Sequence, residues 1–507
     1  MTFARWPVVL LALSVSSAAF GAQSKVARYQ IHIQDPASQT VDIEATLPVS
    51  KAQETLYIPV WTPGYYVKED YKKNVLRIEA HDEKGRVLGL TDAGANRWTV
   101  ATGGARKIVV RYALAAKERS VSRNEVTPTY AVLNGSATYI TVKGDEHVAQ
   151  TVSLDLPKGW VSATGMRKVG SSFAAADYEA LVDSPIMAGD LEILEFTSKG
   201  APHQVVYNRG AVAVDNAKVV ADLKTMADET RGFWAAKPWP HYSFLIAFRT
   251  NTGGGLEHSY STLVNVNPER FATEAGYNAF VGLLAHEYQH AFNVKRLRPL
   301  ELGPFDYEAA PTVSTLWISE GLTSYLSNLM LRRSGLVDDA RYLAGLSRQI
   351  TALQNSPGRL KQSVEQSSLG VWSNSLSGTS ASDTTVSYYI KGEVAGFLLD
   401  AHIRKLTNGK ASLDDVMRAA YAKYSGKTGF RPEEFEAVTD SVAGQSLKPW
   451  FASVIAAPGE VDYAEALDWY GLALTQSPGE HGPKFTLSIK PDATAEQAAR
   501  RKAWLGA

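Results

Sequence analysis

The stretch "AHEYQHAFNVKR" (residues 285–296) carries two histidines, His286 and His290, four positions apart, with Glu287 between them. Positions i and i+4 lie on one face of an α-helix, with Cβ atoms roughly 5–6 Å apart. At that separation two imidazole nitrogens can meet one small cation. The alternative is a surface helix that carries two histidines, because a motif this short also matches by chance. The rest of the sequence must decide between the two.

A catalytic zinc ion usually has three protein ligands and keeps a fourth position for water. The best candidate for a third ligand is Glu320, inside the apolar and aromatic segment "TLWISEGLTSYLSNLMLRR" (315–333). Burial of a lone carboxylate among such neighbours is costly unless the group is paired or ligates a cation. The alternative is a glutamate on the solvated face of an amphipathic helix. The chain has no cysteine, so any metal site must consist of His and carboxylates.

Glu287 points about 100° further round the helix than His286, so it does not easily reach the same metal. That direction suits a general base acting on a water molecule. Two neutral histidines and one carboxylate leave a divalent site with net positive charge, which lowers the pKa of a bound water to about 7. The spacing therefore predicts one zinc ion per chain on His286, His290 and Glu320, with Glu287 as the base.

Length and composition limit the possible classes of protein. The 507 residues indicate two to four domains, and 45% hydrophobic with 21% charged residues is typical of a folded globular protein. Lys+Arg and Asp+Glu both number 52, so the formal net charge is zero. Nothing in this balance favours a polyanionic partner, and we expect no nucleic acid.

The N-terminal stretch "MTFARWPVVLLALSVSSAAFGAQS" resembles an export signal. Arg5 precedes an apolar run from residue 8, and small residues at 19–22 offer a cleavage site. A membrane anchor is the alternative, but the strongly apolar part is short, and no later segment has 18 uninterrupted apolar residues. We expect a signal peptide at 1–22 and an exported protein, periplasmic or secreted, without stable membrane insertion.

The pattern along the chain predicts an α+β fold. Short β-branched and aromatic segments separated by turn residues indicate an antiparallel, sandwich-like β domain over 23–197. A catalytic domain is expected over 198–470, with helices dominating from about 300. Helices are predicted at about 212–235, 314–334, 338–355, 386–406, 412–424 and 431–441, strands at 242–248 and 261–266, and a long loop at 361–385.

Six segments in order carry a resemblance to a known family. They are "PVWTPGYY" (59–66), "GGGLEHSYST" (253–262), "HEYQHAFNVKRLRP" (286–299), "PFDYE" (304–308), "LWISEGLTSYL" (316–326) and "SYYIKGEVAGFLLD" (387–400). With Glu320 some thirty residues after the two histidines, the chain resembles the glycyl aminopeptidase family of gluzincin metallopeptidases. The resemblance implies a β-rich N-terminal domain, a thermolysin-like catalytic domain with a large helical lobe, and one zinc.

The resemblance also implies roles for the glycine-rich segment. In related aminopeptidases a glutamate here binds the free α-amine of the substrate, and the matching residue is Glu257. Gly254 and Gly255 let backbone approach the peptide closely. A glycine-rich turn with an incidental glutamate is the alternative. His258 is expected to be a hydrogen-bonded structural residue.

A tyrosine two residues before Lys-Gly hydrogen-bonds the developing oxyanion in sister families, and here the match is Tyr389, with Tyr388 beside it. A phenol suits this role because it stays protonated at neutral pH. The alternative is a core aromatic on an apolar helix. The segment "PVWTPGYY" is expected to be a packed loop at a domain junction, with a wall of the substrate cleft as the alternative.

Family members usually continue into a C-terminal PDZ domain, and residues 471–507 are expected to be a tail where such a domain would start, without forming one. The favoured function is removal of small N-terminal residues, Gly or Ala, from peptide substrates. The alternatives are a zinc endopeptidase and a non-catalytic peptide-binding protein. An amine anchor at Glu257 would distinguish an aminopeptidase from an endopeptidase, because an endopeptidase has no use for it.

Overall fold

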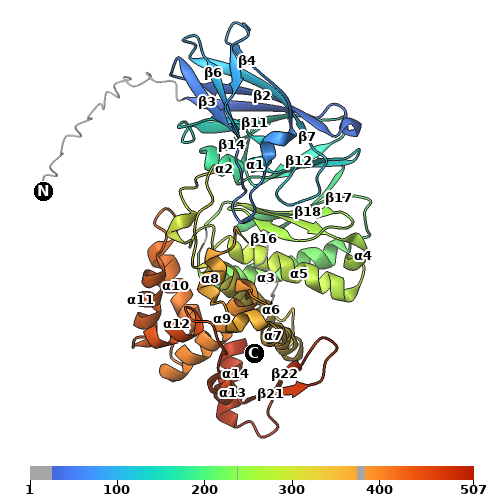
Figure 1. The fold of residues 1–507 in the computed structure, drawn as a ribbon. Coiled ribbons are helices and arrows are strands. Elements are labelled where there is room, and N and C mark those ends of the chain that lie inside the picture. The colour runs from blue at the N-terminus through green and yellow to red at the C-terminus, as the bar shows by residue number, and fades with distance from the viewer. Residues whose placement is uncertain (1–24, 237, 374–382, 507) are drawn as a thin grey trace, which may run out of the picture.

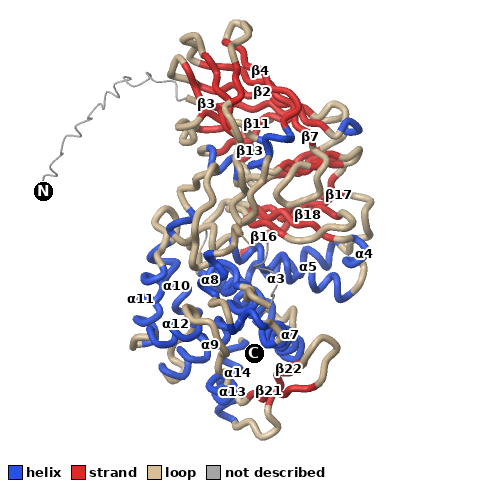
Figure 2. The backbone as a smooth tube through the Cα atoms, viewed as in Figure 1, coloured by secondary structure: helices blue, strands red, loops and turns tan. Residues whose placement is uncertain are grey.

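The computed structural model describes residues 25–236, 238–373 and 383–506. Figures 1 and 2 show a β-rich N-terminal part, a central sheet flanked by helices, and a largely helical C-terminal part. The predicted α+β fold class is confirmed. The predicted signal peptide at 1–22 lies outside the described residues. Within the described ranges, no helix is both long and apolar enough to cross a membrane.

The largest sheet of the N-terminal domain has the strand order β13-β14-β11-β1-β2-β7-β4. Its strands are β1 (Val26–His32), β2 (Thr40–Pro48), β4 (Val75–Asp82), β7 (Lys107–Ala115), β11 (Ala149–Asp155), β13 (Arg167–Val169) and β14 (Ser172–Ala175). Burial alternates along β2, as expected for a strand with one face on a core. Neighbours are antiparallel except β1 and β11, which run parallel.

Two four-stranded sheets complete this domain, with the orders β10-β3-β6-β5 and β12-β15-β9-β8. Their strands are β3 (Gln53–Tyr57), β5 (Leu90–Asp92), β6 (Arg97–Ala101), β8 (Glu125–Val126), β9 (Tyr130–Leu133), β10 (Thr141–Val142), β12 (Val161–Thr164) and β15 (Ile186–Gly189). Short helices α1 (Gly135–Thr138) and α2 (Tyr178–Val182) lie in the same part of the chain.

The central sheet has five strands in the order β16-β17-β18-β20-β19. They are β16 (Leu191–Ser198), β17 (Ala201–Asn208), β18 (Tyr242–Phe248), β19 (Gly255–Glu257) and β20 (Ser261–Val266). Every residue of β18 and β20 is buried, as expected for central strands that are covered on both faces. Among the described residues, β19 pairs with β20 alone and runs antiparallel to it, so it is an edge strand. An edge strand can hydrogen-bond an extended peptide.

The division between domains lies before the expected boundary at residue 197. That boundary falls inside β16, which forms a hairpin with β17 and so belongs to the central sheet. Strand pairing across a tight turn keeps the two together, and the change of sheet therefore falls at Asp190.

Helices α3 (Asn216–Trp234) and α5 (Glu274–His290) lie beneath the central sheet, with the short α4 (Pro268–Phe271) before α5 (Figure 1). α5 starts at a cap in which the Thr273 side chain accepts from the backbone N–H of Gly276. Its apolar positions, among them Phe280, Leu284 and Tyr288, are buried against the sheet and neighbouring helices. This packing holds the histidine-bearing end of α5 at the edge of the sheet.

The helical lobe follows. It consists of a π-helical segment (Trp317–Leu322), α6 (Thr323–Arg333), α7 (Asp339–Gln354), α8 (Val364–Leu369), α9 (Tyr388–Leu406), α10 (Leu413–Tyr424), α11 (Pro432–Ala443), α12 (Lys448–Val454) and α13 (Ala464–Tyr470). The loop predicted at 361–385 contains α8, which a capping box of Ser363 and Gln366 starts. Residues 374–382 of that stretch lie outside the described residues.

The segment expected as a C-terminal tail is packed on this lobe. A hairpin of β21 (Leu472–Ser477) and β22 (Lys484–Ile489) precedes α14 (Ala495–Leu505). Trp504 is fully buried, stacks on Tyr470 with ring centroids 4.3 Å apart, and donates from Nε1 to the hydroxyl of Tyr325 at 2.8 Å. These residues therefore belong to the core of the lobe.

Candidate active site

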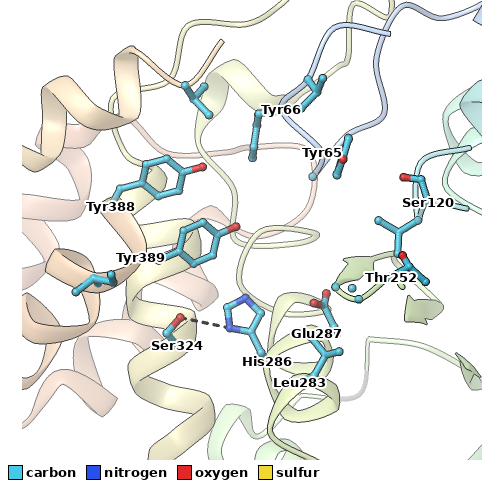
Figure 3. A pocket seen from close by; sticks show the side chains of 18 of the residues that line it. Tyr65, Tyr66, Ser120, Thr252, Leu283, His286, Glu287, Ser324, Tyr388 and Tyr389 are labelled. Carbon is cyan, nitrogen blue, oxygen red and sulfur yellow. Dashed lines mark hydrogen bonds between the residues drawn. The ribbon is translucent and has the colours of Figure 1, made fainter. Parts of the chain in front are cut away.

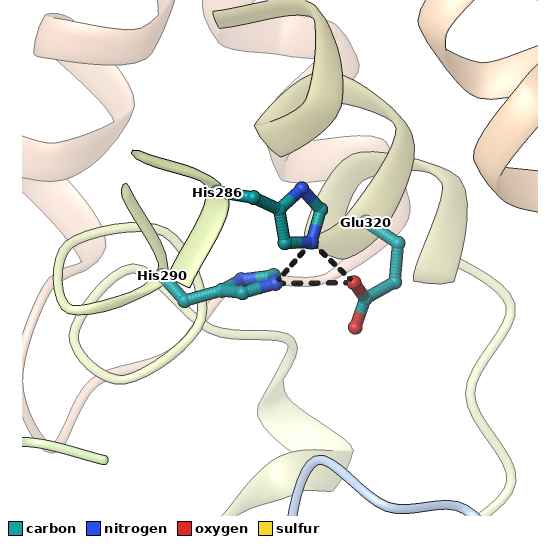
Figure 4. Close-up of side chains that lie close together, drawn as sticks. All are labelled: His286, His290 and Glu320. Carbon is teal, nitrogen blue, oxygen red and sulfur yellow. Dashed lines mark hydrogen bonds and ion pairs between the residues drawn. The ribbon is translucent and has the colours of Figure 1, made fainter. Parts of the chain in front are cut away.

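Three donor atoms from two helical segments converge at the C-terminal end of α5. The Nε2 atoms of His286 and His290 lie 2.9 Å apart, and Glu320 Oε2 lies 3.1 Å from His290 Nε2 and 3.5 Å from His286 Nε2 (Figure 4). His290 and Glu320 are buried, while His286 is partly open to a cavity. The structure thus brings together the three residues that the sequence predicts as metal ligands.

The outer ring nitrogens fix which atoms face the centre. His290 Nδ1 lies 2.9 Å from the carbonyl oxygen of Asn293, which only accepts, so Nδ1 carries the hydrogen and Nε2 presents a lone pair. The Ser324 hydroxyl donates to the Glu320 carbonyl and lies 3.4 Å from His286 Nδ1, which leaves His286 in the same tautomer. Two lone pairs that face each other at this distance repel unless a proton or a metal cation lies between them. Ligand atoms of a tetrahedral zinc, at bonds of about 2.0–2.1 Å, lie roughly 3.3 Å apart, so this donor set fits zinc.

A π-helical turn places Glu320. π-Turns are rare and often occur at functional sites. The side-chain amide of Asn293 donates to the Ile318 carbonyl at 2.8 Å and to the Thr323 hydroxyl at 2.9 Å, and so connects this turn to the residues that follow α5. Asn293 lies in the stretch 285–296 that holds the two histidines, but nothing in the sequence predicts that its side chain binds the turn around Glu320.

Buried carboxylates crowd the centre. Burial opposes ionisation of Glu320, but the two imidazoles outweigh it and hold the pKa of Glu320 at about 2. Burial raises the pKa of Glu257 to about 7, and raises the pKa of Glu287 well above its usual range. Glu257, Glu287 and His290 each have a donor atom within 4.8 Å of the others. A divalent cation would relieve this repulsion.

Glu287 lies against the edge strand. A Cβ on Gly255 would stand 2.2 Å from Glu287 Oε1, so only glycine allows β19 to approach this carboxylate so closely. Gly254 has φ +95° and open space where a Cβ would project. Of the two glycines predicted to admit a peptide, Gly255 is therefore packed on the predicted base, and Gly254 faces the cavity.

Glu257 lies under a glycine from the N-terminal domain. A Cβ on Gly64, where φ is +89°, would stand 2.4 Å from Glu257 Oε1. Glu257 is 4% exposed and lines a small cavity of about 40 Å³, which shares Gly64 and Tyr66 with the large cavity next to His286. Gly64 and Tyr66 belong to "PVWTPGYY", which therefore forms a wall of the cleft as well as a packed junction.

The large cavity measures about 940 Å³ and lies between the first domain, β19 and the helical lobe. Figure 3 shows the hydroxyls of Tyr388 and Tyr389 pointing into it above His286. The ring of Tyr389 lies 6.1 Å from that of His286 and 5.0 Å from that of Tyr388. Burial raises the pKa of both phenols well above the usual value, so both remain hydrogen-bond donors.

A buried ion pair next to Glu257 was not predicted. Lys295 Nζ lies 2.6 Å from Asp183 Oδ1, and Asp183 also accepts from the backbone N–H of Ser259 at 2.8 Å. His258 Nδ1 lies 3.3 Å from the same carboxylate, and the ring is buried, in line with the structural role expected for it. Asp183 comes from the first domain and Lys295 from the stretch after α5. Because the two residues are far apart in the sequence, no local pattern predicts that they pair.

Comparisons with known proteins agree with this geometry. The model of the peptidase M61 N-terminal domain matches residues 28–190, and the model of the M61 glycyl aminopeptidases matches residues 279–395. Together they cover more than half of the chain. No curated protein matches the sequence significantly.

Among solved structures, an aminopeptidase N family protein from Idiomarina loihiensis is 25% identical, with a TM-score of 0.85 over 93% of this chain and 87% of that one. The M1 zinc metallopeptidase from Deinococcus radiodurans is 11% identical, with a TM-score of 0.52 over 86% and 96% of the two chains. Yeast LTA4 hydrolase in complex with bestatin is 12% identical, with a TM-score of 0.53 over 88% and 70%. The last two show likeness of fold alone.

A two-histidine, one-glutamate centre at the edge of a mixed sheet, beside a helical lobe, defines the chain as a metallopeptidase. It belongs to the M61 family, that of the glycyl aminopeptidases.

Proposed function

We propose that the chain is a zinc-dependent aminopeptidase that removes small N-terminal residues, Gly or Ala, from peptides. The observation that carries the proposal is the buried Glu257 carboxylate beside Glu287 and His290. Three carboxylates at this centre would be balanced by one divalent cation together with one ammonium group. A free substrate amine supplies that ammonium, and an internal peptide bond does not.

His286, His290 and Glu320 would hold the zinc ion. When bound, zinc would polarise the scissile carbonyl and lower the pKa of a water molecule at the site. Glu287 then accepts a proton from the attacking water and passes it to the leaving amine.

Tyr389 would donate a hydrogen bond to the oxygen that becomes negative during attack. β19 would pair with the extended substrate backbone at its free edge. Glu257 would receive the α-ammonium, which places the first peptide bond over the metal centre. Gly64 and Tyr66 lie over this position, and the close approach of Gly64 to the Glu257 carboxylate favours a small first side chain.

The test compares peptides that begin with Gly or Ala, with free or acetylated N-termini, in the wild type and in Glu257→Gln. The variant should lose about 10- to 100-fold in kcat/KM for the free peptides, since a charge-assisted contact contributes roughly 1.5–3 kcal/mol. Acetylated peptides should be poor substrates of both proteins. If the wild type cuts acetylated internal sequences as fast as free ones, the enzyme is an endopeptidase.

We further propose that the protein is exported, on the strength of its first 22 residues. Sequencing of the mature N-terminus after expression in a Gram-negative host tests this. A start at residue 22 or 23 supports export, and an intact N-terminus contradicts it.

A further inference from the structure

The large cavity continues past His286 into a pocket between four helices. Leu283 of α5, Ser324 of α6, Gln349 of α7 and Glu393 of α9 line it. Glu393 follows Tyr389 by one turn of α9, about 5.4 Å further along the helix. The pocket therefore extends by about one helical turn beyond the residues that face the metal centre.

Glu393 ends this pocket as a buried carboxylate with unused acceptor capacity. It is 5% exposed, and its Oε1 accepts from Asn328 Nδ2 at 2.8 Å. Across the part of the chain that the structure describes, no other hydrogen bond or ion pair reaches this carboxylate. Burial raises the pKa of Glu393 to about 7, while Asn328 and Arg348 limit the rise. A buried carboxylate usually has more partners than one amide.

The surrounding charges leave room for a cation. Arg348 is the nearby positive group, but it is exposed on α7 and forms no ion pair with Glu393 within the described residues. The neutral amide of Asn328 and the buried phenol of Tyr342 also face Glu393. On the side away from His286, Glu393 lines a second cavity of about 760 Å³ together with Glu274, Arg341 and Arg348, and within the described residues neither arginine forms an ion pair with it. None of them neutralises the carboxylate inside the pocket.

The direction of the substrate assigns this pocket to the second residue. Glu257 lies with Glu287 and His290, at one end of the metal centre, and under the proposed function it holds the α-amine there. The pocket opens beyond His286, at the other end, where Ser324 lies 3.4 Å from His286 Nδ1. The residue after the scissile bond is the one that reaches it.

We infer that Glu393 makes the enzyme selective for a basic side chain, Lys or Arg, in the second position of the peptide. This inference rests on the proposed function for the direction of the substrate. The aliphatic stem of a Lys or Arg spans about one helical turn along Leu283 and Ile390, and its charged end meets Glu393. Ala or Ser side chains are too short for this contact.

The test uses four tripeptides, Gly-Lys-Ala, Gly-Met-Ala, Gly-Glu-Ala and Gly-Lys-Ala with an acetylated side chain. Wild type should prefer Lys over Met and over acetyl-lysine by at least about tenfold in kcat/KM, with Glu poorest. Acetyl-lysine keeps the stem and removes the charge, so this comparison needs no variant. Equal rates for Lys, Met and acetyl-lysine overturn the inference.

Glu393→Gln keeps the shape of the side chain and its contact with Asn328. It should reduce the Lys preference to within about twofold while the rate with Gly-Met-Ala is retained, because only the ionic contact is lost. Glu269→Gln is the matched control, because Glu269 is an exposed carboxylate at the start of α4 and lines neither cavity that Glu393 lines. A Lys preference that persists in Glu393→Gln also overturns the inference.

The same peptides with acetylated N-termini separate the two proposals. If they are cleaved as well as the free peptides and still show a Lys preference that depends on Glu393, the amine anchor has failed and the pocket stands. If free peptides are preferred but Lys and Met are equal, the amine anchor stands and the pocket has failed.

Discussion

Gly321 and Gly392 meet backbone to backbone: a Cβ on Gly321 would lie 2.4 Å from the Cα of Gly392. Gly321 follows the predicted ligand Glu320, and Gly392 follows the tyrosine pair at the start of α9. The contact therefore sets the distance between a metal ligand and the proposed oxyanion donor. It also explains why both motifs contain glycine at these positions, which the sequence alone left open.

Gly321→Ala should destabilise the protein by about 1–3 kcal/mol, since overpacking forces the π-helical turn and α9 apart. Activity should fall beyond the loss in folded protein, because the Tyr389 hydroxyl moves away from the metal centre. Thermal unfolding and kcat measure the two effects. Gly232→Ala in α3 is the control: only the flexible end of Lys199 comes near, at 3.5 Å. Similar effects of both substitutions would contradict the explanation.

Glu320→Ala should remove both metal and activity, because two histidines alone leave the site without its anionic ligand. Glu287→Gln should keep the metal and the fold but lose about 10²–10⁴ in kcat, the usual scale of general base catalysis. Metal content after dialysis at low free zinc, measured alongside activity, distinguishes them. Stoichiometric zinc in Glu320→Ala would show that another residue is the third ligand.

Tyr389→Phe removes one hydroxyl that faces the cavity, so stability should change little. The loss should appear in kcat, on the order of 10²–10³-fold, if the hydroxyl stabilises the developing oxyanion. Tyr388→Phe, the stacked neighbour, is the comparison and should have the smaller effect. A rise in KM with kcat intact would place Tyr389 in ground-state binding.

Asp183→Asn should cost about 3–5 kcal/mol near neutral pH, because Lys295 stays buried without its partner. Burial opposes the charge of Asp183, but Lys295 and His258 outweigh it and hold the pKa of this carboxyl below its usual range. The stabilisation is therefore full above the unfolded pKa, about 3.9, and is lost as pH falls through the lower folded pKa.

The difference in unfolding temperature between wild type and Asp183→Asn should accordingly shrink in acid. Asp42→Asn, which removes an exposed ion pair with Arg77, should change stability little at any pH. A difference for Asp183→Asn that stays constant from neutral pH to about pH 3 would show that charge is not the cause.

Local pattern predicted the elements that carry the centre. The strands at 242–248 and 261–266 have the predicted limits, and α9 starts two residues after the expected helix at 386–406 and ends with it. The two histidines lie on a helix, α5, as predicted. Buried strands and strongly periodic helices have patterns that tertiary context rarely overrides. Two of the three donors follow from the same helical period, since His286 and His290 had to share a face, and Glu320 was predicted from its apolar surroundings.

The rest depends on contacts between distant segments. The contact of Gly64 with Glu257 and the Asp183–Lys295 pair join residues that no short window contains. Glu393 was missed because α9 is buried on most of its faces, which hides one polar position in an apolar pattern. The helix α8 was missed because serine-rich composition resembles that of a loop, although Ser363 and Gln366 are a capping signal.

Under the proposed function, the contact of Gly64 with Glu257 makes selectivity for the N-terminal residue depend on two domains. Gly64 belongs to the first domain and Glu257 to the second, so neither domain alone determines which N-terminal residue is accepted. A chimera that takes its first domain from a relative with a wider loop should keep the metal centre and accept larger N-terminal residues. Substrate profiling of such chimeras, with zinc content as the reference, would show which of the two domains determines a change in substrate specificity.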